Sequence, residues 1–125
     1  MRNFFTILLL FAATLYGDVK YVDIFDAYDE AEVTNKKVMI MVSQIGCRAC
    51  DYMEDIVFKD KRVIEALNSG FIVVHIDKHK QSVPNGLEYF ATPTFFFLNS
   101  DEKLLKRVTG AEHPKEFLET LQSIK

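Results

Sequence analysis

Two cysteines, Cys47 and Cys50, occur in the segment SQIGCRACDYMED, and only two residues separate them. At this spacing two thiols can form a redox couple, supply half of a metal site, or lie in the core as small apolar residues. A disulfide between them would close a very short loop. Because the entropic gain from cross-linking grows with loop length, a purely structural role is disfavoured.

The metal and haem alternatives fit the sequence poorly. A structural zinc site needs four ligands, but the chain has no second cysteine pair and its three histidines, at positions 75, 79 and 113, lack the usual ligand spacing. Covalent haem attachment needs histidine directly after the second cysteine, where Asp51 stands. We therefore expect no metal and no cofactor beyond a redox-active disulfide, with inert core cysteines as the remaining alternative.

The elements around the cysteines favour redox chemistry. Residues 38–43, VMIMVS, form a continuous apolar run that predicts a strand buried on both faces. From Cys47 onward, apolar residues recur at helical spacing, which places Cys47 at a helix N-terminus, where free N–H groups and the helix dipole stabilise a thiolate. We therefore expect Cys47 to be the exposed nucleophile, and Cys50, one turn further in, to be the resolving cysteine.

Other residues near the cysteines are candidates for supporting roles. Arg48 could favour the Cys47 thiolate, or it could be a solvated surface residue. Glu54 lies four residues after Cys50 on the same helix face, where it could accept the Cys50 proton or simply be an exposed acid. Pro93, in FATPTFFF, directly precedes a strand and could hold a cis bond in a tight turn or be an ordinary trans proline.

The remaining pattern predicts a mixed α/β domain. Helices are expected over residues 22–37, 59–70 and 113–125, with a weak helical tail at 87–90, and further strands over 71–77, 94–99 and 104–110, the last two antiparallel. The apolar face of the first helix comprises Ile24, Phe25, Ala27, Tyr28 and Ala31, and that of the last comprises Phe117, Leu118, Leu121 and Ile124. Together they predict a central mixed four-stranded sheet flanked by helices.

Composition and the N-terminal segment bound the class of protein. The chain has 125 residues and a net charge of -3, which suits one domain and gives no basic footprint for nucleic acid. Residues 1–17 combine Arg2, a short apolar run and small residues, which predicts a signal peptide before a domain at 18–125. The run is shorter than the ~20 residues of a spanning helix, although an uncleaved anchor is an alternative. A periplasmic or otherwise extracytoplasmic location would let a disulfide persist.

The segments KKVMIMVSQIGCRAC, FATPTFFFLNSDEK and RVTG together resemble the thioredoxin superfamily, over nearly the whole chain from residue 22 to 124. The chain is similar in particular to the C-terminal domain of the thiol:disulfide interchange protein DsbD. The resemblance implies a thioredoxin-like fold, Cys47 as attacking and Cys50 as resolving cysteine, and Pro93 as a cis-proline beside them. It further implies that Thr92 offers backbone hydrogen bonds to an extended substrate and that Glu54 matches a glutamate near the cysteines of DsbD-like domains.

Two positions depart from the family pattern. Gly46 stands where the family usually has tryptophan, which removes an apolar wall and loosens the loop beside the substrate. Met41 stands where a buried aspartate is common, so proton transfer to Cys50 would depend on Glu54, water or substrate.

The function that follows is an extracytoplasmic thiol–disulfide oxidoreductase that reduces protein disulfides as a monomer, fed by a membrane electron donor. A thiol oxidase, a disulfide isomerase and a non-catalytic binding or chaperone module are the alternatives.

Overall fold

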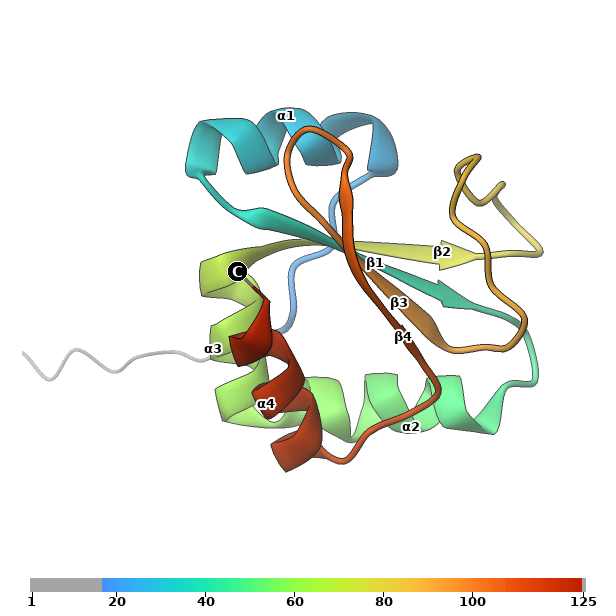
Figure 1. Ribbon diagram of the computed structural model, residues 1–125. Coiled ribbons are helices and arrows are strands. Elements are labelled where there is room, and N and C mark those ends of the chain that lie inside the picture. Colours follow the sequence, from blue (N-terminus) through green and yellow to red (C-terminus); the bar gives the residue numbers. More distant parts are fainter. Residues whose placement is uncertain (1–16, 125) are drawn as a thin grey trace, which may run out of the picture.

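The computed structural model describes residues 17–124 (Figure 1). The signal peptide predicted for residues 1–17 lies outside this part apart from Gly17, so it stays a prediction. In chain order the elements are α1 (Ile24–Thr34), β1 (Lys37–Ser43), α2 (Arg48–Asp55), the 3-10 helix η1 (Val57–Lys59), α3 (Lys61–Gly70), β2 (Phe71–Asp77), β3 (Thr94–Leu98), β4 (Leu104–Thr109) and α4 (Pro114–Ser123).

The four strands form one mixed sheet in the order β2-β1-β3-β4. β1 pairs with β2 in parallel, from Lys37 opposite Phe71 to Ser43 opposite Asp77. β3 runs antiparallel to both β1 and β4. The predicted mixed four-stranded sheet flanked by helices is therefore confirmed.

Helices cover the sheet on both faces, with α1 on one side and α2, α3 and α4 on the other (Figure 1). Because successive side chains of a strand point to opposite faces, β1 supplies both layers. Val38, Ile40 and Val42 pack toward α1, whereas Met39 and Met41 join the core beneath the other three helices. The strand is buried on both faces, as its continuous apolar run predicts.

Aromatic side chains join the C-terminal helix to the sheet. The ring of Phe117, on α4, lies 5.1 Å from that of Phe95 on β3 and 5.7 Å from that of Phe58, between ring centroids. All three side chains are buried, so the predicted apolar face of the last helix holds this side of the molecule together.

Two local predictions are wrong. Phe25 does not belong to the buried face of α1: it is 88% exposed, and the helix approaches the sheet through Ala27 and Ala31, whose small side chains allow close packing. Residues 87–90 form no helix, because four residues after the turn around Gly86 are too few to complete a stable helical segment.

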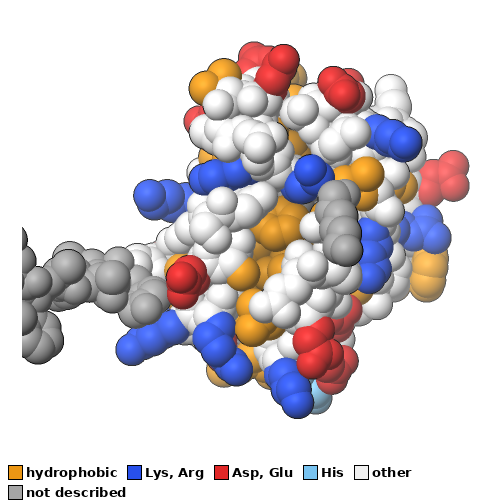
Figure 2. All heavy atoms as spheres, turned by 60° about the vertical axis from the view of Figure 1, so that its left-hand side comes forward, with side chains coloured by type: hydrophobic (Ala, Val, Ile, Leu, Met, Phe, Trp, Pro, Cys, Tyr) orange, Lys and Arg blue, Asp and Glu red, His pale blue; other side chains and the backbone are white. Residues whose placement is uncertain are grey.

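The surface carries charges of both signs. Figure 2 shows lysines and arginines interspersed with acids, around a narrow strip of apolar side chains. Within residues 17–124, no helix combines the length and the apolar character needed to cross a membrane.

Candidate active site

Cys47 and Cys50 form a disulfide at the start of helix α2. Cys47 is the N-cap residue of this helix, and its Cα lies 5.2 Å from that of Cys50. The backbone N–H of Cys50 donates to Sγ of Cys47 at 3.1 Å. Once the disulfide is reduced, the same N–H group and the helix dipole would stabilise a thiolate at Cys47 rather than at Cys50.

The two sulfurs differ in exposure, although less than expected. Cys47 is 8% exposed and Cys50 1%, so the expectation of an exposed Cys47 is wrong. The loop before β3 explains the low exposure of Cys47, because the carbonyl oxygen of Thr92 lies 3.6 Å from its Sγ. Cys47 therefore supplies the small exposed part of the disulfide, while Cys50 is enclosed.

The loop that covers Cys47 is held in place by hydrogen bonds on both sides of Pro93. The peptide bond between Thr92 and Pro93 is cis, and the Pro93 carbonyl accepts a 2.8 Å hydrogen bond from the N–H of Gly110. Thr94 Oγ1 donates to the carbonyl of Ala91 at 2.7 Å. Segments far apart in the sequence thus bring the main chain of Thr92 against the disulfide, where the predicted backbone contact with substrate would occur.

Gly46, directly before Cys47, has a left-handed backbone with a φ of 76°. No atom lies within 4 Å of a Cβ built there, so space does not select glycine; the backbone conformation does. Tryptophan, the usual residue of the family at this place, would be strained here. The loop is thus held in a conformation that suits glycine, which explains the first departure from the family pattern.

The requirement for glycine at position 46 can be tested with alanine, because any side chain with a Cβ is strained at this positive φ. We expect Gly46→Ala to lower the free energy of unfolding by about 1–2 kcal/mol. Gly70→Ala is the matched control, because Gly70 has no left-handed φ and ends helix α3, so alanine should be neutral or stabilise by up to about 1 kcal/mol. Urea unfolding of the two oxidised variants measures both values, and equal effects would contradict the assignment.

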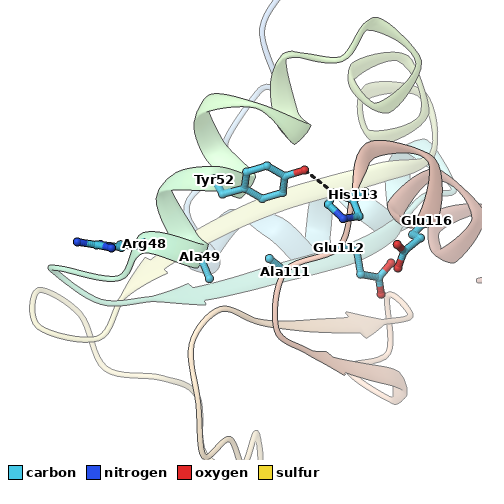
Figure 3. Close-up of a pocket in the computed structure, with 7 residues that line it drawn as sticks. All are labelled: Arg48, Ala49, Tyr52, Ala111, Glu112, His113 and Glu116. Carbon is cyan, nitrogen blue, oxygen red and sulfur yellow. Dashed lines mark hydrogen bonds between the residues drawn. The ribbon is translucent and has the colours of Figure 1, made fainter.

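Arg48 is exposed, in agreement with the solvated alternative, so water and salt screen its effect on the Cys47 thiolate. Together with Ala49 it borders an open pocket of about 500 Å³, between α2 and the segment that leads into α4 (Figure 3). Across the pocket, Oη of Tyr52 lies 2.8 Å from Nδ1 of His113, and Arg48 extends away from this pair.

Glu54, the predicted proton acceptor, lies on α2 one turn after Cys50. Its Oε1 is 3.3 Å from Nδ1 of His75 on β2. Nε2 of the same ring lies 2.6 Å from Oγ of Ser43, at the end of β1. Met41, which pairs with His75 across β1 and β2, is fully buried. It stands where the family commonly has a buried aspartate, so this position supplies no carboxylate.

The sequence did not predict these groups. Ser43 and Tyr52 were not predicted as site residues, and His75 and His113 were considered only as metal ligands. The available signal was that His75 interrupts the apolar run FIVVHID, where a polar residue needs a partner. Within residues 17–124, no group of three or more histidine, cysteine or acidic side chains could hold a metal ion.

A disulfide at the N-terminus of the helix that follows a buried central strand, covered by a cis-proline loop, defines a thiol–disulfide oxidoreductase. The chain belongs to the thioredoxin-like domain family, which matches residues 24–125.

Solved structures show the same fold. A thioredoxin from Thermus thermophilus superposes with a TM-score of 0.70 at 24% identity, over 85% of this chain and 86% of that one. The DsbH oxidoreductase gives 0.67 at 12% identity, over 86% and 84%. The oxidised C-terminal domain of Neisseria meningitidis DsbD gives 0.60 at 18% identity, over 78% and 89%. No curated protein matches the chain.

Proposed function

We propose that the protein reduces disulfides of other proteins in an extracytoplasmic compartment. The observation that carries the chemistry is the Cys47–Cys50 disulfide, with the Cys50 N–H directed at Sγ of Cys47. The location is supported by the predicted signal peptide and by the similarity to the DsbD domain, and the direction by the resemblance to DsbD-like reductants.

The reaction would proceed in two exchanges. The Cys47 thiolate attacks a substrate disulfide, forms a mixed disulfide and releases one substrate thiolate. The Cys50 thiolate then attacks Sγ of Cys47, so that the Cys47–Cys50 bond forms, the bond to substrate breaks, and the second substrate thiolate leaves. The substrate gains two electrons, and a membrane thiol donor would return the protein to its dithiol form.

A thiol oxidase is the second candidate, because one observation favours it. The N–H of Cys50 and the dipole of α2 stabilise the reduced Cys47 thiolate, and stabilising the reduced form makes a couple more oxidising. The exposed position of Arg48 weakens its contribution to this effect.

The redox potential of the Cys47–Cys50 couple, measured against glutathione, separates the two directions. We expect a value of about −270 mV, as in thioredoxin, whereas a value of about −120 mV would favour the oxidase. Arg48→Ala serves as a control for surface charge. Because Arg48 is exposed, we expect this substitution to shift the potential by less than about 30 mV, and a larger change would show that Arg48 acts directly on the thiolate.

A further inference from the structure

Three polar side chains, Ser43, His75 and Glu54, form a connected chain, and Glu54 lies on α2 one turn after Cys50. The Ser43 hydroxyl lies 2.6 Å from Nε2 of His75, and Nδ1 of the same ring lies 3.3 Å from Oε1 of Glu54. The exposed fraction falls along the chain, from 32% for the Glu54 side chain to 27% for that of His75 and 5% for Ser43. Both ring nitrogens of His75 therefore face a polar partner.

The strand register explains why these residues meet. His75 pairs with Met41 across the parallel β1–β2 ladder, and Ser43 lies two residues further along β1. Residues two apart on a strand share a face, so Ser43 lies on the face of Met41, which packs in the same core as Cys50. Helix α2 crosses this face and supplies Glu54 one turn beyond Cys50.

The partners determine how the imidazole is held. A carboxylate only accepts hydrogen bonds, so the tautomer with its proton on Nδ1 suits Glu54, and Nε2 is then free to accept the hydroxyl hydrogen of Ser43. When the ring is protonated, it forms an ion pair with Glu54 and donates from Nε2 to the Ser43 oxygen. In both forms the ring is fixed from behind by a nearly enclosed hydroxyl and presents Nδ1 to the carboxylate.

We propose that His75 is a positioning residue that holds the Glu54 carboxylate where it can accept the proton of Cys50 during resolution. The inference rests on the proposed role of Glu54 in the exchange. The Cys50 thiol gives its proton to Glu54, the resulting thiolate attacks Sγ of Cys47, and the substrate leaves as a thiolate. Glu54 then returns the proton to the leaving thiolate or to water, so protons and electrons balance.

The burial of Ser43 shows that this serine–histidine–carboxylate chain does not act as the catalytic triad of a serine hydrolase. In serine hydrolases the hydroxyl of a serine–histidine–carboxylate chain attacks the substrate. Ser43 is only 5% exposed and ends a central strand, so a substrate carbonyl cannot approach its oxygen. Ser43 therefore serves as the anchor of the histidine.

Tyr21 also borders this cluster. Its ring lies against His75, with 5.8 Å between centroids. Burial and, after it, the negative charges of Glu54 and Asp18 raise the pKa of Tyr21 to about 12. The carboxylate of Glu54, 3.3 Å from Nδ1 of His75, is directed toward β2.

The test separates the two exchanges of one turnover. The reduced full chain is mixed with the aromatic disulfide of thionitrobenzoate, and stopped-flow absorbance follows release of the first thionitrobenzoate by Cys47 and of the second by Cys50. We expect His75→Leu to slow the second release about tenfold and to leave the first unchanged. This loss is smaller than the roughly 10²–10⁴-fold effect of removing a general base, because Glu54 remains in the protein.

Two conservative variants identify the ring nitrogen that matters. The amide nitrogen of His75→Asn can take the place of Nδ1 and should restore most of the rate, whereas that of His75→Gln corresponds to Nε2 and should not. In a Glu54→Gln background, His75→Leu should have no further effect, because the group that it positions is gone. If His75→Leu does not fold, the comparison of the two amide variants carries the same test.

Several results would overturn the inference. These are an unchanged second release in His75→Leu, an equal loss in both releases, equal rates for the asparagine and glutamine variants, or a full His75→Leu effect in the Glu54→Gln background. A wild-type chain that releases no thionitrobenzoate would instead refute the proposed function. If Glu54→Gln alone resolves as fast as wild type, the role of Glu54 fails, and the inference fails with it.

Discussion

Replacing Cys47 by serine is expected to abolish thiol–disulfide exchange, with a loss of about three orders of magnitude or more in turnover. A serine hydroxyl remains protonated at neutral pH and is a far weaker nucleophile toward sulfur than a thiolate. The helix N-terminus and the Cys50 N–H stabilise a negatively charged thiolate at position 47, and a neutral serine hydroxyl does not gain from this effect. Reduction of a model protein disulfide, followed by release of free thiols, measures the loss.

Replacing Cys50 instead should trap the first intermediate. Cys47 can still attack, but no second thiol can reach its sulfur, so a covalent mixed disulfide with substrate should accumulate and disappear on addition of a small thiol. Ala49→Ser is the matched control, because it places a serine between the two cysteines and leaves both thiols intact. The redox function would be refuted if Cys50→Ser formed no mixed disulfide, or if Cys47→Ser kept wild-type turnover. Either result would favour the non-catalytic binding module.

Phe117→Ala is expected to lower the free energy of unfolding by about 3–5 kcal/mol. The side chain is fully buried, and its ring contacts both Phe58 and Phe95, so alanine would leave a cavity between α4 and the sheet. This loss is a large part of the total stability of a small domain, which is typically about 5–15 kcal/mol. Urea unfolding of the oxidised chain, with a comparison of midpoint and slope, gives the value.

Phe25→Ala supplies the control for this experiment. The same substitution is made, but Phe25 is 88% exposed, so its removal should change the free energy of unfolding by less than about 0.5 kcal/mol. Similar losses at both positions, or a loss below about 1 kcal/mol for Phe117→Ala, would show that the aromatic cluster does not hold α4 in place.

Much of the fold follows from local sequence patterns. A strand buried on both faces leaves a continuous apolar run, which is why β1 and β2 could be predicted close to their observed bounds. The apolar face of α4 was also correct, since Phe117 and Leu121 are buried. Phe25 was misplaced because a pattern of apolar residues gives the side of a helix only within a residue or two, and here two alanines fit closest to the sheet.

Local sequence features are enough to predict the redox couple. The C-x-x-C spacing, the buried strand before it and the helix after it are local features, and thiolate chemistry at a helix N-terminus follows from them. The enclosure of Cys47 depends on long-range packing, since the carbonyl of Thr92 that lies against it comes from 45 residues further along the chain. The left-handed backbone of Gly46 was also not predictable, because a glycine in the sequence is compatible with both positive and negative φ.

Around Cys50, too, some contacts follow from the local sequence and others from the pairing of distant strands. Helical spacing places Glu54 one turn from Cys50, but nothing local indicates that a histidine and a serine meet it there. Ser43 and His75 lie 32 residues apart and come together only because β1 and β2 pair in parallel in one particular register. A shift of one residue in that register would send one of the two side chains to the α1 face, so contacts across the sheet belong to the tertiary structure.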